Sequence, residues 1–245
     1  MFLFVLILAI DTSTRTGSIA LLRDGGLLAE VFSQEETPYS MRLFRDLEVL
    51  KAKAEIELSQ IDLFAVTSGP GSFTGLRIGL TAVKAWAEVY GKPIAAISAL
   101  EAISSQSKAA EDEQNQESRI LAPFFDARRG QIFGAIYRRG TGTIPALELA
   151  GEESILTPSE FIELVKGSSH SGEPRLVSPV PGLLPPSLVE ELIPGAAIEA
   201  VSPVLAPVIG RLGFERARRG ELVDPLRLDA NYVRRSDAEA KWRDG

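Results

Sequence analysis

Apolar residues along the first part of the chain follow patterns that predict three consecutive strands. The first ten residues are almost wholly apolar, and burial of a strand on both faces produces such an unbroken run. Two shorter apolar runs lie on either side of Asp24-Gly25-Gly26, and Asp-Gly between apolar runs is a hairpin signal. We therefore predict an antiparallel meander with strands at 6–11, 18–22 and 27–33.

The next segments predict helices that alternate with strands. Helices are expected at 40–54, 74–90 and 100–108, and strands at 63–67 and 94–97. The second helix should end at Gly91-Lys92-Pro93, because glycine takes the left-handed closing conformation and proline cannot continue a helix. Strands that alternate with helices imply crossover connections, so this pattern predicts a layered α/β subdomain.

A polar and acidic stretch between residues 104 and 119 carries almost nothing to bury. A chain of 245 residues is long enough for one large core or for two smaller ones. We therefore place a boundary in this stretch. It separates an N-terminal subdomain, 1–108, from a smaller C-terminal subdomain, 119–245.

The C-terminal part of the sequence is less regular. Strands are predicted at 121–125 and 131–137, around a tight turn, and a helix should begin after Thr157. Several prolines between residues 179 and 186 predict irregular backbone. The last predicted elements are a helix from Ser202 to Arg219 and a strand at 226–233.

The apolar start of the chain also resembles the core of a signal peptide. No basic residue precedes it, however, and Asp11-Thr12-Ser13-Thr14 stands where small cleavage-site residues belong. It is also much shorter than the roughly 20 residues of a membrane helix. We expect a buried strand here and no membrane segment.

Composition narrows the classes of function. Hydrophobic residues make up 45% and charged residues 24%, as in ordinary globular proteins. The net charge of -7 disfavours RNA binding by the chain alone. The chain has no cysteine, which fits a reducing compartment, and its single histidine, His170, lies in a Gly/Ser-rich loop. Neither a zinc site nor Ser-His-Asp hydrolysis is therefore expected.

The strongest local motif is the glycine-rich run from Gly69 to Gly79, which leaves a strand and enters a helix. Such a loop can hold a phosphate with backbone amides. The run lacks the Gly-Lys-Ser or Gly-Lys-Thr of a Walker loop, because Leu76 and Arg77 follow Gly75. It also lacks the dinucleotide fingerprint. A packing role, in which Gly75 and Gly79 admit another helix, explains more of its residues.

Apolar positions cover a wide arc of this helix, wider than a single sheet would hide. The helix before it is broadly apolar as well. One interpretation is that the two helices form half of a helical interface with another chain. The alternative is that both are simply core. The first interpretation makes interface candidates of apolar and small residues on the two helices, namely Leu43, Leu47, Phe73, Gly75, Leu76, Gly79 and Leu80.

A second motif, Asp11-Thr12-Ser13-Thr14, follows the first strand. It resembles the phosphate-binding turn of the sugar kinase, actin and Hsp70 fold, in which the Asp positions hydrated Mg²⁺. That family usually has Asp-x-Gly-Thr, and here Ser13 replaces the glycine. Asp11, Thr12, Ser13 and the later Asp126 are the nucleotide-site candidates. The alternative is a strand-end Asp that satisfies its own turn.

Two basic segments remain. Asp126-Ala127-Arg128-Arg129-Gly130 can offer paired guanidiniums to an anion, and is more often a charged hairpin tip. From Ser202 onward nine basic residues face seven acidic ones, which suits RNA contact or a solvated helix.

Taken in order, these segments resemble the TsaB (YeaZ) family over essentially the whole chain. The most specific piece is Gly-Pro-Gly-Ser-Phe-Thr-Gly-Leu-Arg, beginning at Gly69. The other matching pieces are Ile7 to Thr14 with Ser18 to Leu21, Ser98 to Ala102, Asp126-Ala127-Arg128 with Gly130, and Tyr232 to Glu239.

The resemblance implies an α/β fold of the actin, Hsp70 and sugar-kinase type (ASKHA, ribonuclease H-like), with two subdomains, the second reduced. It implies a cytoplasmic, non-catalytic partner of the paralogue TsaD, which transfers threonylcarbamoyl to tRNA adenosine, with the ATPase TsaE binding the pair. It further implies a homodimer when alone, tRNA contact only through the complex, and at most weak ATP or ADP with Mg²⁺ at the subdomain cleft.

The family's contact with TsaD, or with a second copy, is built from the two helices of the N-terminal subdomain. Carried over, this supports Phe73, Thr74, Leu76, Arg77, Ile78 and Leu80 as interface residues. One departure is that members often have His-Ser where this chain has Tyr39-Ser40. Two rival functions are an ATP-using enzyme of the sugar-kinase class and a glycoprotease, an old label of this wider family.

Overall fold

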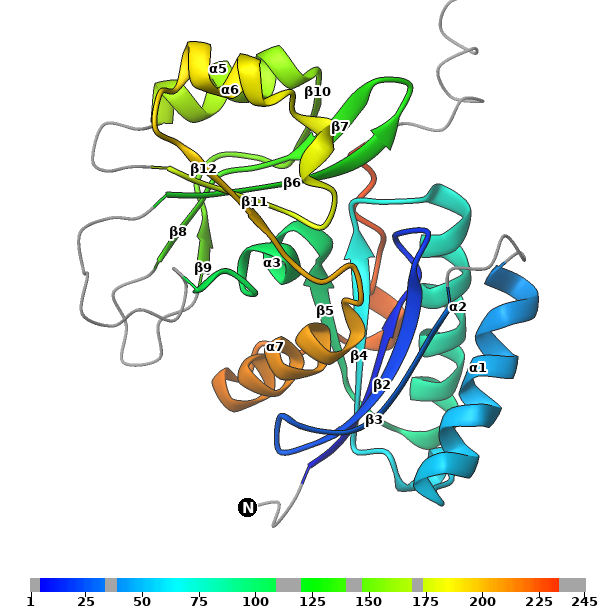
Figure 1. The fold of residues 1–245 in the computed structure, drawn as a ribbon. Coiled ribbons are helices and arrows are strands. Elements are labelled where there is room, and N and C mark those ends of the chain that lie inside the picture. Colours follow the sequence, from blue (N-terminus) through cyan, green and yellow to red (C-terminus); the bar gives the residue numbers. More distant parts are fainter. Residues whose placement is uncertain (1–4, 34–38, 109–119, 140–146, 169–173, 234–245) are drawn as a thin grey trace, which may run out of the picture. The chain divides into compact units, whose positions relative to one another are not determined.

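The computed structural model describes residues 5–33, 39–108, 120–139, 147–168 and 174–233 (Figure 1). The chain divides into two compact units. The first consists of Met1–Ala99 together with Val204–Gly245, and the second is Leu100–Pro203. Among the described residues, no helix is both long and apolar enough to cross a bilayer.

The first unit is built on a five-stranded sheet with the order β3-β2-β1-β4-β5. Its strands are β1 (Leu6–Asp11), β2 (Gly17–Arg23), β3 (Gly26–Ser33), β4 (Leu63–Gly69) and β5 (Ile94–Ser98). The pairs β1–β2 and β2–β3 are antiparallel, whereas β1–β4 and β4–β5 are parallel. The predicted meander and the strands that alternate with helices are therefore confirmed.

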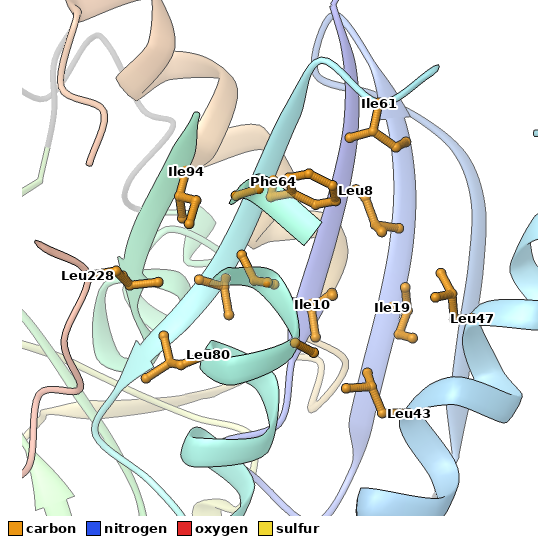
Figure 2. Packing of buried hydrophobic residues seen from close by; sticks show 14 of the residues in the cluster. Leu8, Ile10, Ile19, Leu43, Leu47, Ile61, Phe64, Leu80, Ile94 and Leu228 are labelled. Atoms are coloured by element: carbon orange, nitrogen blue, oxygen red, sulfur yellow. The ribbon is translucent and has the colours of Figure 1, made fainter. Parts of the chain in front are cut away.

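Three helices cover the two faces of this sheet. They are α1 (Tyr39–Ala54), α2 (Phe73–Tyr90) and α7 (Ala206–Arg219), and a short 3-10 turn, η1 (Leu58–Gln60), precedes β4. Side chains alternate between the faces of a strand, so Leu8, Ile10 and Phe64 point toward α1 and α2, where they form one apolar core (Figure 2).

Helix α2 begins after a capping serine and ends at a left-handed glycine. The hydroxyl of Ser72 accepts a hydrogen bond from the amide of Gly75 at 3.3 Å and caps the start of the helix. At its end Gly91 has φ 61°, and its amide donates to the carbonyl of Ala87. The predicted end at Gly91 is confirmed, because a left-handed residue closes the helix there.

Small residues let α7 lie close to the opposite face of the sheet. A Cβ on Gly213 would come within 2.8 Å of Cβ of Ala65, and one on Gly210 within 2.2 Å of Leu22. The guanidinium of Arg216 donates to the backbone carbonyl of Ala96. The helix is thus fitted closely to the first unit's sheet.

The second unit has its own seven-stranded sheet, in which β10-β7-β6-β11-β12 are consecutive and β8 joins β6 to β9. Its strands are β6 (Ile120–Arg128), β7 (Gln131–Gly134), β8 (Tyr137–Arg139), β9 (Leu147–Leu149), β10 (Ser154–Leu156), β11 (Arg175–Ser178) and β12 (Ala197–Ala200). Its helices are α3 (Ala99–Ser104), α5 (Pro158–Ser168), η2 (Pro181–Leu183) and α6 (Pro186–Leu192). The rings of Phe124 and Phe161 pack against each other at a tilt in its separate core.

The division of the chain differs from the predicted boundaries 1–108 and 119–245. The structure assigns the residues from Val204 onward to the first unit, and the second unit begins at Leu100. The reason is that α7 covers one face of the first sheet, with its glycines against β2 and β4. Continuity along the sequence is therefore a poor guide to which unit a segment joins.

Several predicted elements also differ. The strand predicted at 226–233 is instead the 3-10 turn η3 (Pro225–Arg227) followed by irregular backbone. The helix predicted from Ser202 begins at Ala206, and the proline-rich region contains the short helix α6. His170 and residues 234–245, including the end of the tail motif, lie outside the described residues.

Candidate functional site

The turn after β1 is organised around a buried carboxylate. Oδ1 of Asp11 accepts hydrogen bonds from the amide of Ser13 at 2.9 Å, from the hydroxyl of Ser13 at 2.6 Å and from the hydroxyl of Thr67 at 2.9 Å. From the described residues, Oδ2 accepts one longer bond, 3.4 Å, from the hydroxyl of Thr14. Asp11, Thr12 and Ser13 are all buried. Of the predicted nucleotide-site residues, these three are thus brought together.

Burial raises the pKa of Asp11 above its ordinary value of 3.8, although the hydrogen bonds from Ser13, Thr67 and Thr14 act in the opposite direction. Loss of water disfavours the charged form of a carboxyl group, and here that effect is larger than the stabilisation by the donors. The carboxyl group of Asp11 therefore serves mainly as an acceptor within its own turn.

The glycines of the Gly69–Gly79 run bring α2 and its loop against this turn. A Cβ on Gly75 would lie 2.0 Å from the carbonyl oxygen of Thr12, and one on Gly79 would lie 2.3 Å from its hydroxyl. A Cβ on Gly71 would meet Ser13 at 2.6 Å. The amide of Ser72 also donates to the carbonyl of Ser13 at 2.8 Å. Close packing thus accounts for these glycines, as the packing interpretation of the motif requires, although the neighbour is a turn and not a helix.

Asp126, the fourth nucleotide-site candidate, belongs to the second unit, near the turn between β6 and β7. Its carboxylate accepts the amide of Arg128 at 2.7 Å and lies 3.8 Å from Nε of the same arginine. Arg128 and Arg129 both have positive φ, 67° and 56°. The segment is a tight, charged hairpin turn, which agrees with the simpler interpretation of its sequence.

Helices α1 and α2 turn many of the predicted interface residues inward. Figure 2 shows Leu43, Leu47 and Leu80 directed at the sheet. The buried members of the predicted set are Leu43, Leu47, Gly75, Leu76, Gly79 and Leu80. The four leucines lie in the first unit's own core, and the two glycines pack against Thr12. Contrary to the prediction, these six residues therefore offer no surface to another chain. The wide apolar arc of α2 is explained in part by the turn after β1, which covers its glycine side.

The outward faces of α1 and α2 nevertheless carry exposed apolar side chains. Met41 is 70% exposed and Phe44 is 54% exposed. Phe44 contacts Trp86 of α2 edge to face, with 6.2 Å between ring centroids. From the predicted set, Thr74 and Arg77 are exposed, and Phe73 and Ile78 are half-buried. We call the area formed by Met41, Phe44, Thr74, Ile78 and Trp86 the two-helix face.

Met41 and Phe44 belong to the broadly apolar helix that the sequence predicted as part of an interface, although the residues chosen from that helix were Leu43 and Leu47. Phe44 follows the inward-facing Leu43 directly, and adjacent residues of a helix lie about 100° apart, so an apolar neighbour of a core leucine points elsewhere. A large apolar residue next in sequence to a core-facing leucine was therefore the signal that could have identified Phe44 as exposed.

A buried ion pair fixes α1 beside the turn. Arg42 is 2% exposed, and its Nη2 donates to the carbonyl of Arg15 at 3.4 Å. Its Nε lies 4.0 Å from Oδ2 of Asp46, one helical turn later. This pair was also missed, and its spacing of four residues on a helix was the available signal. Among the described residues, no group of three or more His, Cys, Asp or Glu side chains is arranged to hold a metal ion.

The fold is that of the actin, Hsp70 and sugar-kinase class. A ROK family protein from Streptococcus pneumoniae shares it, with a TM-score of 0.51 and 12% sequence identity over 89% of this chain and all of that one. Closer likeness is found to YeaZ from Pseudomonas aeruginosa, with a TM-score of 0.67 and 25% identity over 93% of this chain and 99% of that one.

Sequence comparison is more specific. Residues 21–175 match the family model described as "TsaD: tRNA N6-adenosine threonylcarbamoyltransferase". The tRNA threonylcarbamoyladenosine biosynthesis protein TsaB of Bacillus subtilis is 28% identical over 236 residues, which cover 96% of this chain and 97% of that protein. The TsaB protein of Escherichia coli is 33% identical over 135 residues, about half of each chain. The chain therefore belongs to the TsaD family and, within it, to the TsaB (YeaZ) proteins.

Proposed function

We propose that the chain takes part in the biosynthesis of N6-threonylcarbamoyladenosine in tRNA as a non-catalytic subunit that binds and supports the catalytic paralogue TsaD. The names of its curated relatives support the pathway. The observation that supports a binding role is the two-helix face, where Met41 and Phe44 expose apolar surface. Large apolar side chains gathered on one exposed face are typical of protein interfaces.

The two-helix face is suited to binding a partner because buried residues of α1 hold the helix in place. Leu43 and Leu47 anchor α1 to the sheet, and Arg42 ties it to the turn after β1. Interfaces on rigid elements lose less conformational entropy on binding. We infer that TsaD covers Met41, Phe44 and Ile78, and that core residues of the same helices act only by holding this face in place.

Co-purification with TsaD of the same organism tests the proposal. A Met41→Glu and Phe44→Glu double variant places two charges on the two-helix face, and we expect an affinity for TsaD lower by on the order of 100-fold. Val180→Glu is the matched control, because Val180 is an exposed apolar residue of the second unit. The control should bind as the unmodified chain does. Equal binding by the double variant, with unchanged melting temperature, would remove the proposed face.

The same variants examine self-association. We propose that the chain forms a homodimer when TsaD is absent and that the homodimer uses the same face. Light scattering after size-exclusion chromatography should then show a dimer for the unmodified chain and a monomer for the double variant. TsaE is expected to bind only the complex with TsaD, and tRNA only through that complex, in the cytoplasm.

Nucleotide binding by this chain is expected to be weak or absent. Oδ1 of Asp11 already accepts three hydrogen bonds within its own turn, and burial disfavours the charged form of the carboxyl group that hydrated Mg²⁺ requires. Titration calorimetry with ATP and Mg²⁺ distinguishes this proposal from the sugar-kinase alternative. Tight binding with turnover by the isolated chain would favour that enzyme class.

A further inference from the structure

The last described residues form a strap on the first unit. We call Val223–Val233 the C-terminal strap. It begins where the amide of Val223 donates to the carbonyl of Ile94 at 2.8 Å, beside β5. Leu228 is buried in the core shared by α2 and the sheet (Figure 2). These two contacts hold the first half of the strap against the first unit.

The strap continues to the loop before α2. The amide of Asn231 donates to the carbonyl of Ser68 at 2.7 Å. Gly69 has φ 133°, and a Cβ there would lie 2.4 Å from the carbonyl oxygen of Asn231. A side chain at position 69 would therefore displace the strap, so this glycine fixes where Asn231 lies.

The next residue, Tyr232, reaches the first turn of α2. Its ring packs at a tilt of 38° against that of Phe73, with centroids 4.8 Å apart. Its hydroxyl oxygen accepts a hydrogen bond from Nε of Arg77 at 3.1 Å. The guanidinium of Arg77 lies 3.9 Å from the centroid of the Phe73 ring and 5.9 Å from that of Tyr232. Two aromatic rings and one hydrogen bond thus hold an exposed guanidinium group in a single orientation.

Arg77 has no acidic partner among the described residues. A guanidinium group has five N–H donors, and Nε supplies the one that Tyr232 accepts. Its terminal nitrogens remain for an acceptor with a planar, bidentate shape. Thr74, three residues before Arg77, is also exposed, whereas Ile78, one residue after it, is half-buried.

We propose that the C-terminal strap is part of the TsaD-binding interface, with Tyr232 as a positioning residue that holds Arg77 ready to pair with a carboxylate of TsaD. This inference rests on the proposed function, because it assigns one contact within that interface. Holding a long side chain before binding lowers the entropy lost on association. Tyr and Arg are also the residue types that most often contribute strongly at interfaces.

A carboxylate suits this position better than a phosphate of RNA. The net charge of the chain is -7, which opposes a polyanion, and RNA binding needs several cations acting together. Arg77 is instead an exposed cation that is next in sequence to the half-buried, apolar Ile78. Such a mixture of one charge and apolar surface is typical of a protein interface.

The test measures the dissociation constant between the full chain and purified TsaD of the same organism, without tRNA. We expect Arg77→Glu to weaken binding by on the order of 100-fold and Arg77→Lys by about 10-fold, because lysine keeps the charge but not the planar fork. Tyr232→Ala should weaken it by about 10-fold, mainly through faster dissociation. Tyr232→Phe, which keeps the ring, should lie between Tyr232→Ala and the unmodified chain.

A double-variant cycle separates positioning by Tyr232 from direct contact. If Tyr232 acts through Arg77, Tyr232→Ala adds nothing in an Arg77→Ala background. An undiminished effect in that background overturns the positioning role. Binding by Arg77→Glu within two-fold of the unmodified chain overturns the carboxylate contact, as does a loss that appears only when tRNA is added. Failure of the unmodified chain to bind TsaD at all contradicts the proposed function itself.

Discussion

Single glycines decide how closely α2 lies against the turn after β1. The hydroxyl of Thr12 is only 2.3 Å from the place that a Cβ on Gly79 would occupy, and the carbonyl of Thr12 leaves still less room at Gly75. Ordinary van der Waals contact therefore requires glycine at both positions. The hydrogen bonds around Asp11 depend on the same turn. A change in the packing of α2 against this turn should therefore also disturb the hydrogen bonds that Asp11 accepts.

Gly79→Ala should lower the free energy of unfolding by about 1–3 kcal/mol, because the added methyl group overfills a closed site. Urea denaturation measures the change. Gly167→Ala in α5 is the matched control, since a Cβ there meets nothing within 4 Å. The control should be stabilised by about 0.5–1 kcal/mol, because alanine is the better helix former. Equal effects at the two positions would contradict the close approach of α2.

A second prediction at this scale concerns pH. The pKa of Asp11 is raised by burial above its ordinary 3.8, so the unfolded chain loses this proton at lower pH than the folded chain does. Ionisation of Asp11 thus favours unfolding as pH rises through 3.8 and up to the raised value. Asp11→Asn lacks this dependence and keeps an acceptor for Ser13 and Thr67.

The free energy of unfolding of Asp11→Asn should therefore increase relative to that of the unmodified chain as pH rises from below 3.8 to the raised pKa of Asp11. Urea titrations of both proteins at a series of pH values give this difference. A difference that is independent of pH, or that falls as pH rises, would show that the carboxylate of Asp11 is stabilised and not disfavoured in the folded state.

Each of the helices α1 and α2 has one face in the core and another outside it. The pattern of apolar residues predicted both helices and the end of α2 at Gly91. It did not distinguish the core-facing Leu43 and Leu47 from the exposed Phe44, because all three are apolar. The periodicity of apolar residues shows that a helix has an apolar side. It does not show that the turn after β1 covers the glycine side of α2, because this contact joins segments that are far apart in the sequence.

The two faces of α1 should respond differently to truncation. Leu47→Ala removes a buried side chain and should lower the free energy of unfolding by about 2–5 kcal/mol. Phe44→Ala, at a position 54% exposed, should change it by less than about 1 kcal/mol while it weakens binding to TsaD. Urea denaturation and a binding titration of both variants provide the measurements. A larger loss of stability at Phe44 than at Leu47 would reverse the assigned faces.

At the scale of the whole molecule, the first unit is assembled from both ends of the chain. The fold class and the family follow from the order of elements and from the Gly69–Gly79 run. The predicted boundary failed for the last segment, because the small residues Gly210 and Gly213 fit Leu22 and Ala65, which are about 150 to 190 positions away in sequence. A fit between residues so far apart in the sequence cannot be recognised from the local pattern of apolar and polar residues.

A fragment with residues 1–108 should therefore not fold, because the sheet would lack α7 on one face. Residues 1–99 joined by a flexible linker to 204–245 should fold, since this combination contains every element of the first unit. Circular dichroism and urea denaturation distinguish the two. Cooperative unfolding of the 1–108 fragment would contradict the role given to α7.

Helix α7 and the C-terminal strap belong to the first unit but are synthesised after the second unit. Strands β1 to β5 leave the exit tunnel long before the helix that covers their second face. The second unit, encoded between the two parts of the first, has all its elements available earlier. The nascent chain must therefore hold an apolar sheet half-covered until α7 has left the exit tunnel, and a stop codon placed anywhere before α7 would release a product that chaperones and proteases recognise.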